Sequence, residues 1–262
     1  MHLRENRLKK ILERGATALG CSFNEARDAG MVYAMAAAGA DSVFIDLEHN
    51  PHNLETVSDL IAHAHAAGIT PIVRPPQVDY AWITRLLDCG CQSLLIPRLR
   101  RPAEVEQLLE LSLYHPRGRR GVAVVGGAGV NYQEVTDVPA ATAWANDQML
   151  LALVVETPEA VENLDGMLMP GIGLVVMGYQ DLAQGYGVLG NRDHPLIADA
   201  EAEVRTRCLE RGIAFGTFQP DLEKISEEVS KGAQLIVHGG VFAFIRRGVR
   251  EAAAVVHGGP SE

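Results

Sequence analysis

Several short apolar stretches of this 262-residue chain end in side chains that could do chemistry. In the clearest example, residues 42–50, an apolar run is followed by Asp46, Glu48 and His49. An apolar run that stops at charge is typical of a buried parallel strand whose C-terminal end opens into a site. A carboxylate beside an imidazole can orient it and raise its basicity, which suits a general base near neutral pH. We therefore expect Asp46 and His49 to form an acid–base pair, with a purely structural histidine as the alternative.

Three other strand-like runs also end in ionisable side chains. Arg74 lies between such a run and two prolines, so its guanidinium would be a rigid bidentate donor to a carboxylate or enolate oxygen. Glu156 and Asp181 follow consecutive runs, and two carboxylates that approach each other need a cation between them or a proton on one. Oxygen ligands with open positions suit Mg2+ or Mn2+. An ion pair with a nearby arginine is the alternative for these carboxylates.

Asp88 and the basic residues are weaker candidates. Asp88 lies at the end of a predicted helix and could pair with Arg74 or reach the site of a neighbouring subunit. The basic residues gather at 98–101 and 117–120, and we interpret them as loop charges or subunit contacts rather than anion sites.

The elements that would position these residues follow an alternating pattern of strands and helices. This pattern predicts a single (β/α)8 TIM barrel over residues 1–262, in which residues just past the strand ends converge on one mouth. A doubly wound sheet is the alternative, but no glycine-rich phosphate motif follows the first strand. The predicted strands are 16–23, 42–46, 69–73, 93–97, 149–155, 174–177, 213–217 and 235–237, and the predicted helices are 5–14, 24–38, 53–67, 79–88, 103–113, 137–147, 158–165, 195–211, 221–230 and 241–256.

A long connection interrupts the alternation after the fourth strand, from about 115 to 146. It contains one apolar burst, 122–125, which we expect to form a short irregular piece. Long loops inside compact domains are usually functional, so this one should lie over the barrel mouth or at a subunit contact.

Composition narrows the class of protein. A net charge of −10 argues against a nucleic-acid surface. The four cysteines form no C-x-x-C pair, which suggests reduced thiols in a cytoplasmic protein. The N-terminal residues lack the apolar core of a signal peptide, and no stretch approaches 18 apolar residues, so we expect no membrane association.

The ordered motifs resemble those of the HpcH/HpaI aldolase/citrate lyase family over about residues 16 to 245. That family reads roughly D-x-E-H, V-R-P, L-L-D-x-G, P-P-x-G-x-R-G, Q-I-E-T and G-P-x-D-L. The matching segments here are Asp-Leu-Glu-His at 46–49, Val-Arg-Pro at 73–75, Leu-Leu-Asp-x-Gly at 86–90, Leu-Ile-Pro at 95–97, His-Pro-Arg-Gly-Arg-Arg-Gly at 115–121, Val-Glu-Thr at 155–157 and Gly-Tyr-Gln-Asp-Leu at 178–182.

The resemblance implies a class II aldolase that acts on 2-oxo acids with a divalent metal, Mg2+, Mn2+ or Co2+. It implies that Glu156 and Asp181 bind the metal and that Arg74 holds the pyruvate oxygens. It also implies that His49 with Asp46 activates a water or the substrate hydroxyl. The partners would be a small 2-oxo acid and an aldehyde, in a homohexamer (a trimer of dimers) that exchanges a C-terminal helix between subunits.

Three departures from the family pattern concern substrate recognition. Val154 replaces a glutamine, and Tyr179-Gln180 places bulkier groups beside the carboxylates, with Gln180 a candidate substrate contact. The loop after Gly121 lacks the basic residue often seen there. We therefore consider two alternatives: a citrate-synthase-like condensation of oxaloacetate with an acyl-CoA, and a barrel that binds a 2-oxo acid without turning it over.

Overall fold

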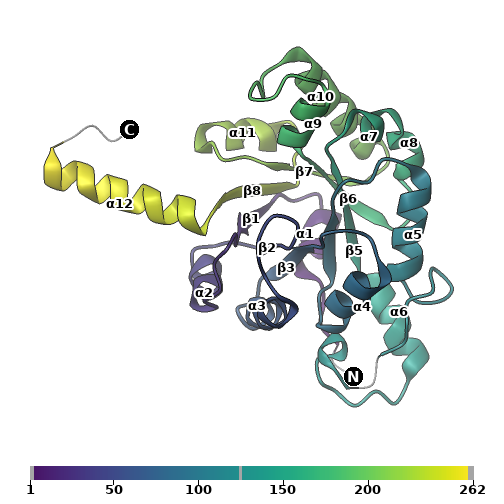
Figure 1. Cartoon of the computed structure of the whole chain (residues 1–262). Coiled ribbons are helices and arrows are strands. Elements are labelled where there is room, and N and C mark those ends of the chain that lie inside the picture. Colours follow the sequence, from purple (N-terminus) through teal and green to yellow (C-terminus); the bar gives the residue numbers. More distant parts are fainter. Residues whose placement is uncertain (1–2, 124–125, 259–262) are drawn as a thin grey trace.

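The computed structural model describes residues 3–123 and 126–258, and its eight parallel strands close into one barrel in chain order (Figure 1). The closed (β/α)8 architecture predicted from the alternating pattern is confirmed. The strands are β1 Ala18–Ser22, β2 Ser42–Asp46, β3 Thr70–Arg74, β4 Ser93–Ile96, β5 Leu150–Val155, β6 Ile172–Met177, β7 Ala214–Phe218 and β8 Leu235–Gly240.

Helices connect the strands, and most of them lie around the barrel against the outer face of the strands (Figure 1). They are α1 Arg7–Glu13, α2 Gly30–Ala37, α3 Leu54–Ala66, α4 Tyr80–Asp88, α5 Pro102–Ser112, α6 Val138–Gln148, α7 Pro158–Glu162, α8 Leu164–Met167, α9 Tyr179–Gly185, α10 Pro195–Glu210, α11 Leu222–Ser230 and α12 Val241–His257, with a 3-10 turn, η1, at Ala128–Val130. Side-chain caps fix several of these starts, as where the Asn53 carboxamide accepts from the Thr56 N–H at the start of α3.

Two apolar layers hold the barrel together. Inside it, residues such as Phe44, Ile72 and Val154 pack against one another, and Leu8 and Leu12 of α1 join this layer from the N-terminal end. Outside it, the opposite faces of the strands pack against the helices in a larger core. With α1 closing one end and the interior filled, the C-terminal ends of the strands form the open mouth.

Strand register places Asp46 beside Arg74, because β2 and β3 pair in parallel with these two residues opposite each other. Both lie at the C-terminal end of their strand and both are buried. The register therefore brings together two residues that are 28 positions apart in the chain.

Two local predictions were wrong. The helix predicted over 158–165 is divided into α7 and α8 at Asn163, and α9 follows β6 immediately where no helix was predicted. In the long connection, Val122 and Ala123 have no regular structure, as expected, whereas 124–125 lie outside the described residues.

The last helix, α12, extends away from the barrel (Figure 1). Phe242, Ile245, Val249 and Val256 recur at helical spacing on it and are 42%, 52%, 63% and 75% exposed. Across the residues placed in the structure, no helix has the length and apolarity needed to cross a membrane.

Candidate active site

A cavity of about 410 Å³ opens at the C-terminal mouth of the barrel. Its wall includes five of the residues predicted from the sequence: His49, Arg74, Glu156, Gln180 and Asp181. They come from the ends of β2, β3, β5 and β6, as the strand-end argument required.

Arg74 is fixed by a bidentate ion pair with Asp46. Its Nε and Nη2 donate to Asp46 Oδ1 and Oδ2 at 2.7 and 2.8 Å, and its Nη1 lies 3.1 Å from Glu48 Oε2. Burial acts to lower the pKa of Arg74, but the hydrogen bonds to Asp46 and the nearby carboxylates raise it above its usual value. Arg74 is therefore a permanently charged donor held in one orientation at the cavity wall.

Asp46 supports Arg74 and does not itself line the cavity. Besides Arg74 it accepts the Glu48 N–H at 3.0 Å and the Asn50 side-chain amide at 2.9 Å. Burial acts to raise the pKa of Asp46, but Arg74 and the Glu48 N–H lower it below its usual value. Every Asp46 oxygen is thus engaged, and among the described contacts none is a hydrogen bond to His49.

His49 is exposed, with 60% of its side chain accessible, against 11% for Arg74 and 37% for Asp181. Its Nε2 lies 3.7 Å from Glu48 Oε2, so its nearest carboxylate is Glu48 rather than Asp46. The motifs alone assign no role to Glu48, yet the structure places it between His49 and Arg74.

Glu156 is almost fully buried beside two other carboxylates. Burial, together with the charges of Glu48 and Asp181, raises its pKa to about 7, although the hydrogen bond from the Arg98 N–H acts to lower it. Gly178 leaves room for this side chain, because a Cβ there would lie 2.5 Å from Glu156 Cβ and 2.8 Å from its Oε2. The charge of Asp181 is one of the causes that raise the pKa of Glu156, so the two carboxylates lie near each other in the cavity.

Arg98 is a site residue that the sequence patterns do not single out. Its backbone N–H donates to Glu156 Oε1 at 2.6 Å, and its Nη1 lies 3.7 Å from Asp181 Oδ1. Its φ of 60° is in the left-handed region, which is uncommon for a residue other than glycine. The interpretation of this arginine as a loop or subunit-contact charge misses its role, although it comes two residues after β4, where the strand-end rule would have found it.

Asp88 does not reach this cavity within one chain. Its Oδ1 accepts from Arg120 Nη2 at 2.8 Å, and it lines a much smaller cavity near the long connection. The predicted pairing of Asp88 with Arg74 is therefore wrong for a single subunit.

Residues 21–244 match the HpcH/HpaI aldolase/citrate lyase family. The chain belongs to this family. A hydroxypyruvate/pyruvate aldolase from Pseudomonas aeruginosa is 32% identical, and the match covers 99% of this chain and 96% of the relative. A 4-hydroxy-2-oxo-heptane-1,7-dioate aldolase from Escherichia coli is 30% identical, and the match covers 95% of this chain and 94% of the relative. The crystal structure of an HpcH/HpaI aldolase from Desulfitobacterium hafniense matches with a TM-score of 0.89 at 29% identity, covering 97% of each chain.

Membership of the HpcH/HpaI aldolase/citrate lyase family, with relatives that are themselves aldolases, identifies the chain as a carbon–carbon lyase. The fold and the class of enzyme expected from the motifs are therefore confirmed.

The two carboxylates of the site suit a divalent cation that keeps open positions. Among residues 3–123 and 126–258, no three His, Cys, Asp or Glu side chains are grouped so that they could hold a metal ion. A site with only Glu156 and Asp181 therefore needs water and substrate oxygens to complete it, which is how Mg2+ and Mn2+ are commonly bound. Burial and the neighbouring charges of Glu48 and Asp181 both oppose ionisation of Glu156, and a bound cation would offset these unfavourable effects, so the carboxylates present fit a divalent metal.

Proposed function

We propose that the chain is a divalent-metal-dependent aldolase that cleaves or forms a carbon–carbon bond next to a pyruvate-type 2-oxo acid. The observation that carries this is one cavity holding the fixed guanidinium of Arg74 and the two carboxylates Glu156 and Asp181. The aldolases among its relatives support the same reaction class.

Arg74 would bind the carboxylate and keto oxygens of the 2-oxo acid. Asp46 and Glu48 hold the guanidinium in place, so little entropy is lost when it meets the substrate. Gln180, on the cavity wall, would contribute a neutral polar contact to the same substrate.

Glu156 and Asp181 would hold the divalent cation, Mg2+, Mn2+ or Co2+. When bound, this cation would supply Lewis-acid stabilisation of the negative charge that develops on the substrate oxygens. Gly178 lets the Glu156 side chain occupy its position, and the Arg98 N–H fixes one of its oxygens.

His49 would move the proton at the hydroxyl that is made or broken. It lies on the cavity wall and is exposed enough to exchange protons with solvent. Glu48, 3.7 Å from its Nε2, would stabilise the imidazolium form, while Asp46 would act by holding Arg74.

The exposed apolar side chains of α12 support assembly of several copies. We propose a homohexamer in which α12 packs against a neighbouring subunit, because its apolar residues would then be covered.

The proposal is tested by exchange of the pyruvate methyl protons in deuterated water, with Mg2+, Mn2+ or Co2+ and after chelation by EDTA. We expect exchange that requires the metal, is lost in Glu156→Gln and persists in Glu162→Gln, a matched change at an exposed glutamate of α7. Exchange that is indifferent to EDTA would contradict the metal-dependent mechanism.

A parallel assay addresses the condensation alternative. The assay measures the release of free thiol from acetyl-CoA in the presence of oxaloacetate. Thiol release by an enzyme that shows no aldolase activity with any aldehyde would favour the citrate-synthase-like activity instead.

A further inference from the structure

Arg192 is an arginine of the cavity wall that has no acidic partner in the described part of the chain. It belongs to the loop between α9 and α10 and lines the same cavity as Arg74. Its guanidinium carbon lies 3.9 Å from the centre of the Tyr179 ring, so the guanidinium stacks on the face of this ring. A guanidinium on an aromatic face keeps its N–H groups free at its edge.

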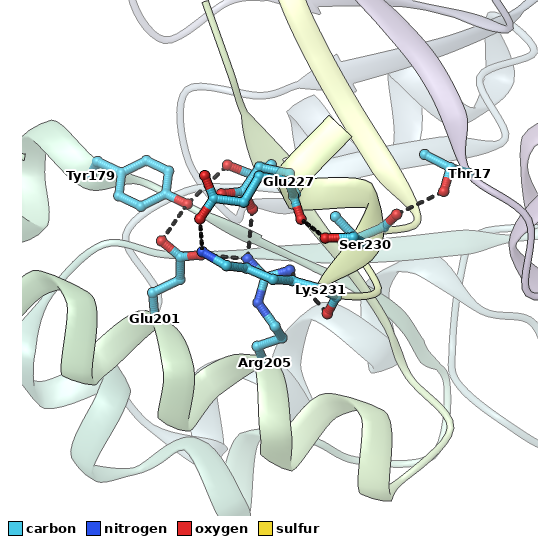
Figure 2. Close-up of polar contacts among 10 residues, drawn as sticks. Thr17, Tyr179, Glu201, Arg205, Glu227, Ser230 and Lys231 are labelled. Atoms are coloured by element: carbon cyan, nitrogen blue, oxygen red, sulfur yellow. Dashed lines mark hydrogen bonds and ion pairs between the residues drawn. The ribbon is translucent and has the colours of Figure 1, made fainter. Parts of the chain in front are cut away.

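Tyr179 is a rigid support for this guanidinium. Its hydroxyl donates to Glu201 Oε2 at 3.0 Å and lies 2.9 Å from Thr217 Oγ1, and the side chain is buried. Figure 2 shows how Glu201 in turn contacts Arg205, which also donates to Glu228 Oε2 at 2.6 Å. The ring is thus anchored from β7, α10 and α11, so the position of Arg192 is defined by the barrel rather than by its loop alone.

Two other arginines at the mouth, Arg74 and Arg98, already have carboxylate partners. Arg74 is paired with Asp46 and Glu48. Arg98, which lies next to the cavity, is 3.7 Å from Asp181. Arg192 therefore provides free donors at the cavity wall, and planar carboxylates are the partners that such a fork binds best.

We propose that Arg192 binds a carboxylate on the second substrate, so that the acceptor aldehyde of this enzyme is an acidic one. This inference rests on the proposed aldolase function. Arg74 holds the 2-oxo acid, and Arg192, on the α9–α10 side of the mouth, holds the charged end of the aldehyde.

The test compares aldehydes that carry a terminal carboxylate, from glyoxylate to 5-oxopentanoate, with neutral aldehydes of the same length, each with pyruvate. The measured quantity is the ratio of kcat/KM for the acidic aldehyde to kcat/KM for the neutral one. In Arg192→Gln we expect this ratio to fall by about 10- to 100-fold, mainly through KM, because a charge-assisted hydrogen bond to the carboxylate is lost.

Two further variants separate recognition from structural damage. Arg192→Lys keeps the charge but not the planar fork, so it should recover part of the ratio. Arg14→Gln, an equal change of charge at the exposed end of α1, should leave the ratio unchanged. A variant that merely disturbs folding lowers both kcat/KM values together and leaves their ratio intact.

The outcomes distinguish this inference from the function on which it rests. If the wild-type enzyme exchanges the pyruvate methyl protons but Arg192→Gln leaves the ratio unchanged, the assignment of Arg192 is overturned and the aldolase function stands. If the wild-type enzyme shows no exchange with any metal, both fail.

Discussion

Among single residues, Glu156 carries the clearest electrostatic conflict at the barrel mouth. Its pKa of about 7 in the folded chain is above the ordinary 4.5, because burial and the charges of Glu48 and Asp181 oppose its ionisation. The unfolded chain therefore releases this proton at lower pH than the folded one. In the metal-free protein, the contribution of Glu156 to the free energy of unfolding therefore falls as the pH rises from about 4.5 through 7.

Replacing Glu156 with glutamine should relieve this cost. With EDTA present, we expect Glu156→Gln to be more stable than the wild type at about pH 8, by on the order of 2–4 kcal/mol, and to show little difference at about pH 4. Urea denaturation at both pH values measures the effect, with Glu162→Gln as the control. A stabilisation that does not change with pH would contradict the assigned cause.

The pairing of Arg74 with Asp46 gives a second prediction at this scale. Arg74→Met leaves two carboxylates beside each other without their counter-ion and should cost about 3–5 kcal/mol of unfolding free energy. The double variant Arg74→Met with Asp46→Asn should lose less free energy of unfolding than the sum of the losses in the two single variants. A double-mutant cycle on the surface ion pair Arg101–Glu104 serves as the control, and we expect its coupling free energy to be under about 1 kcal/mol.

Among the elements, the junction of β6 and α9 packs closely against Glu156 of the site. Gly178 lies between the strand and the helix, and a methyl group there would meet Glu156 and also Val154, whose Cγ1 would lie 2.9 Å from the added carbon. Gly178→Ala should therefore displace Glu156, reduce aldolase activity by about tenfold or more and destabilise the fold by about 1–3 kcal/mol.

Activity assays and urea denaturation check this prediction. Gly127→Ala is the control, because no atom lies within 4 Å of a Cβ at that position and its φ of −86° suits alanine. Full activity in Gly178→Ala would show that the Glu156 side chain has room to move.

Strand order and strand ends could be predicted from sequence because each buried strand is a short apolar run with a charge at its end. The predicted bounds of β2 are the observed ones, Ser42–Asp46. The pattern misses α9 because this helix starts directly after β6, with no polar linker to mark a boundary between them. Partners across the site could not be predicted either: that Asp46 holds Arg74 rather than His49 depends on strand register and side-chain direction, which no single segment encodes.

At the scale of the whole molecule, α12 extends away from the barrel with several exposed apolar side chains (Figure 1). Its exposed apolar residues predict that Val249→Asp shifts the protein from the proposed hexamer to smaller species, because a charge would then be buried at the contact. Sedimentation velocity measures the change. Glu251→Gln, on the other side of the same helix, should sediment as the wild type does, and an unaltered Val249→Asp would contradict a contact through this face.

The pairing of β2 with β3 also bears on the order in which a growing chain acquires its site. Asp46 and Arg74 emerge close together, whereas Asp181 follows more than a hundred residues later, about 5–20 s at ordinary rates of synthesis. A nascent chain that ends within β5 thus contains the whole guanidinium half of the site and neither carboxylate of its proposed metal half. Arg74 has its counter-ion from an early stage and does not depend on the later strands for neutralisation.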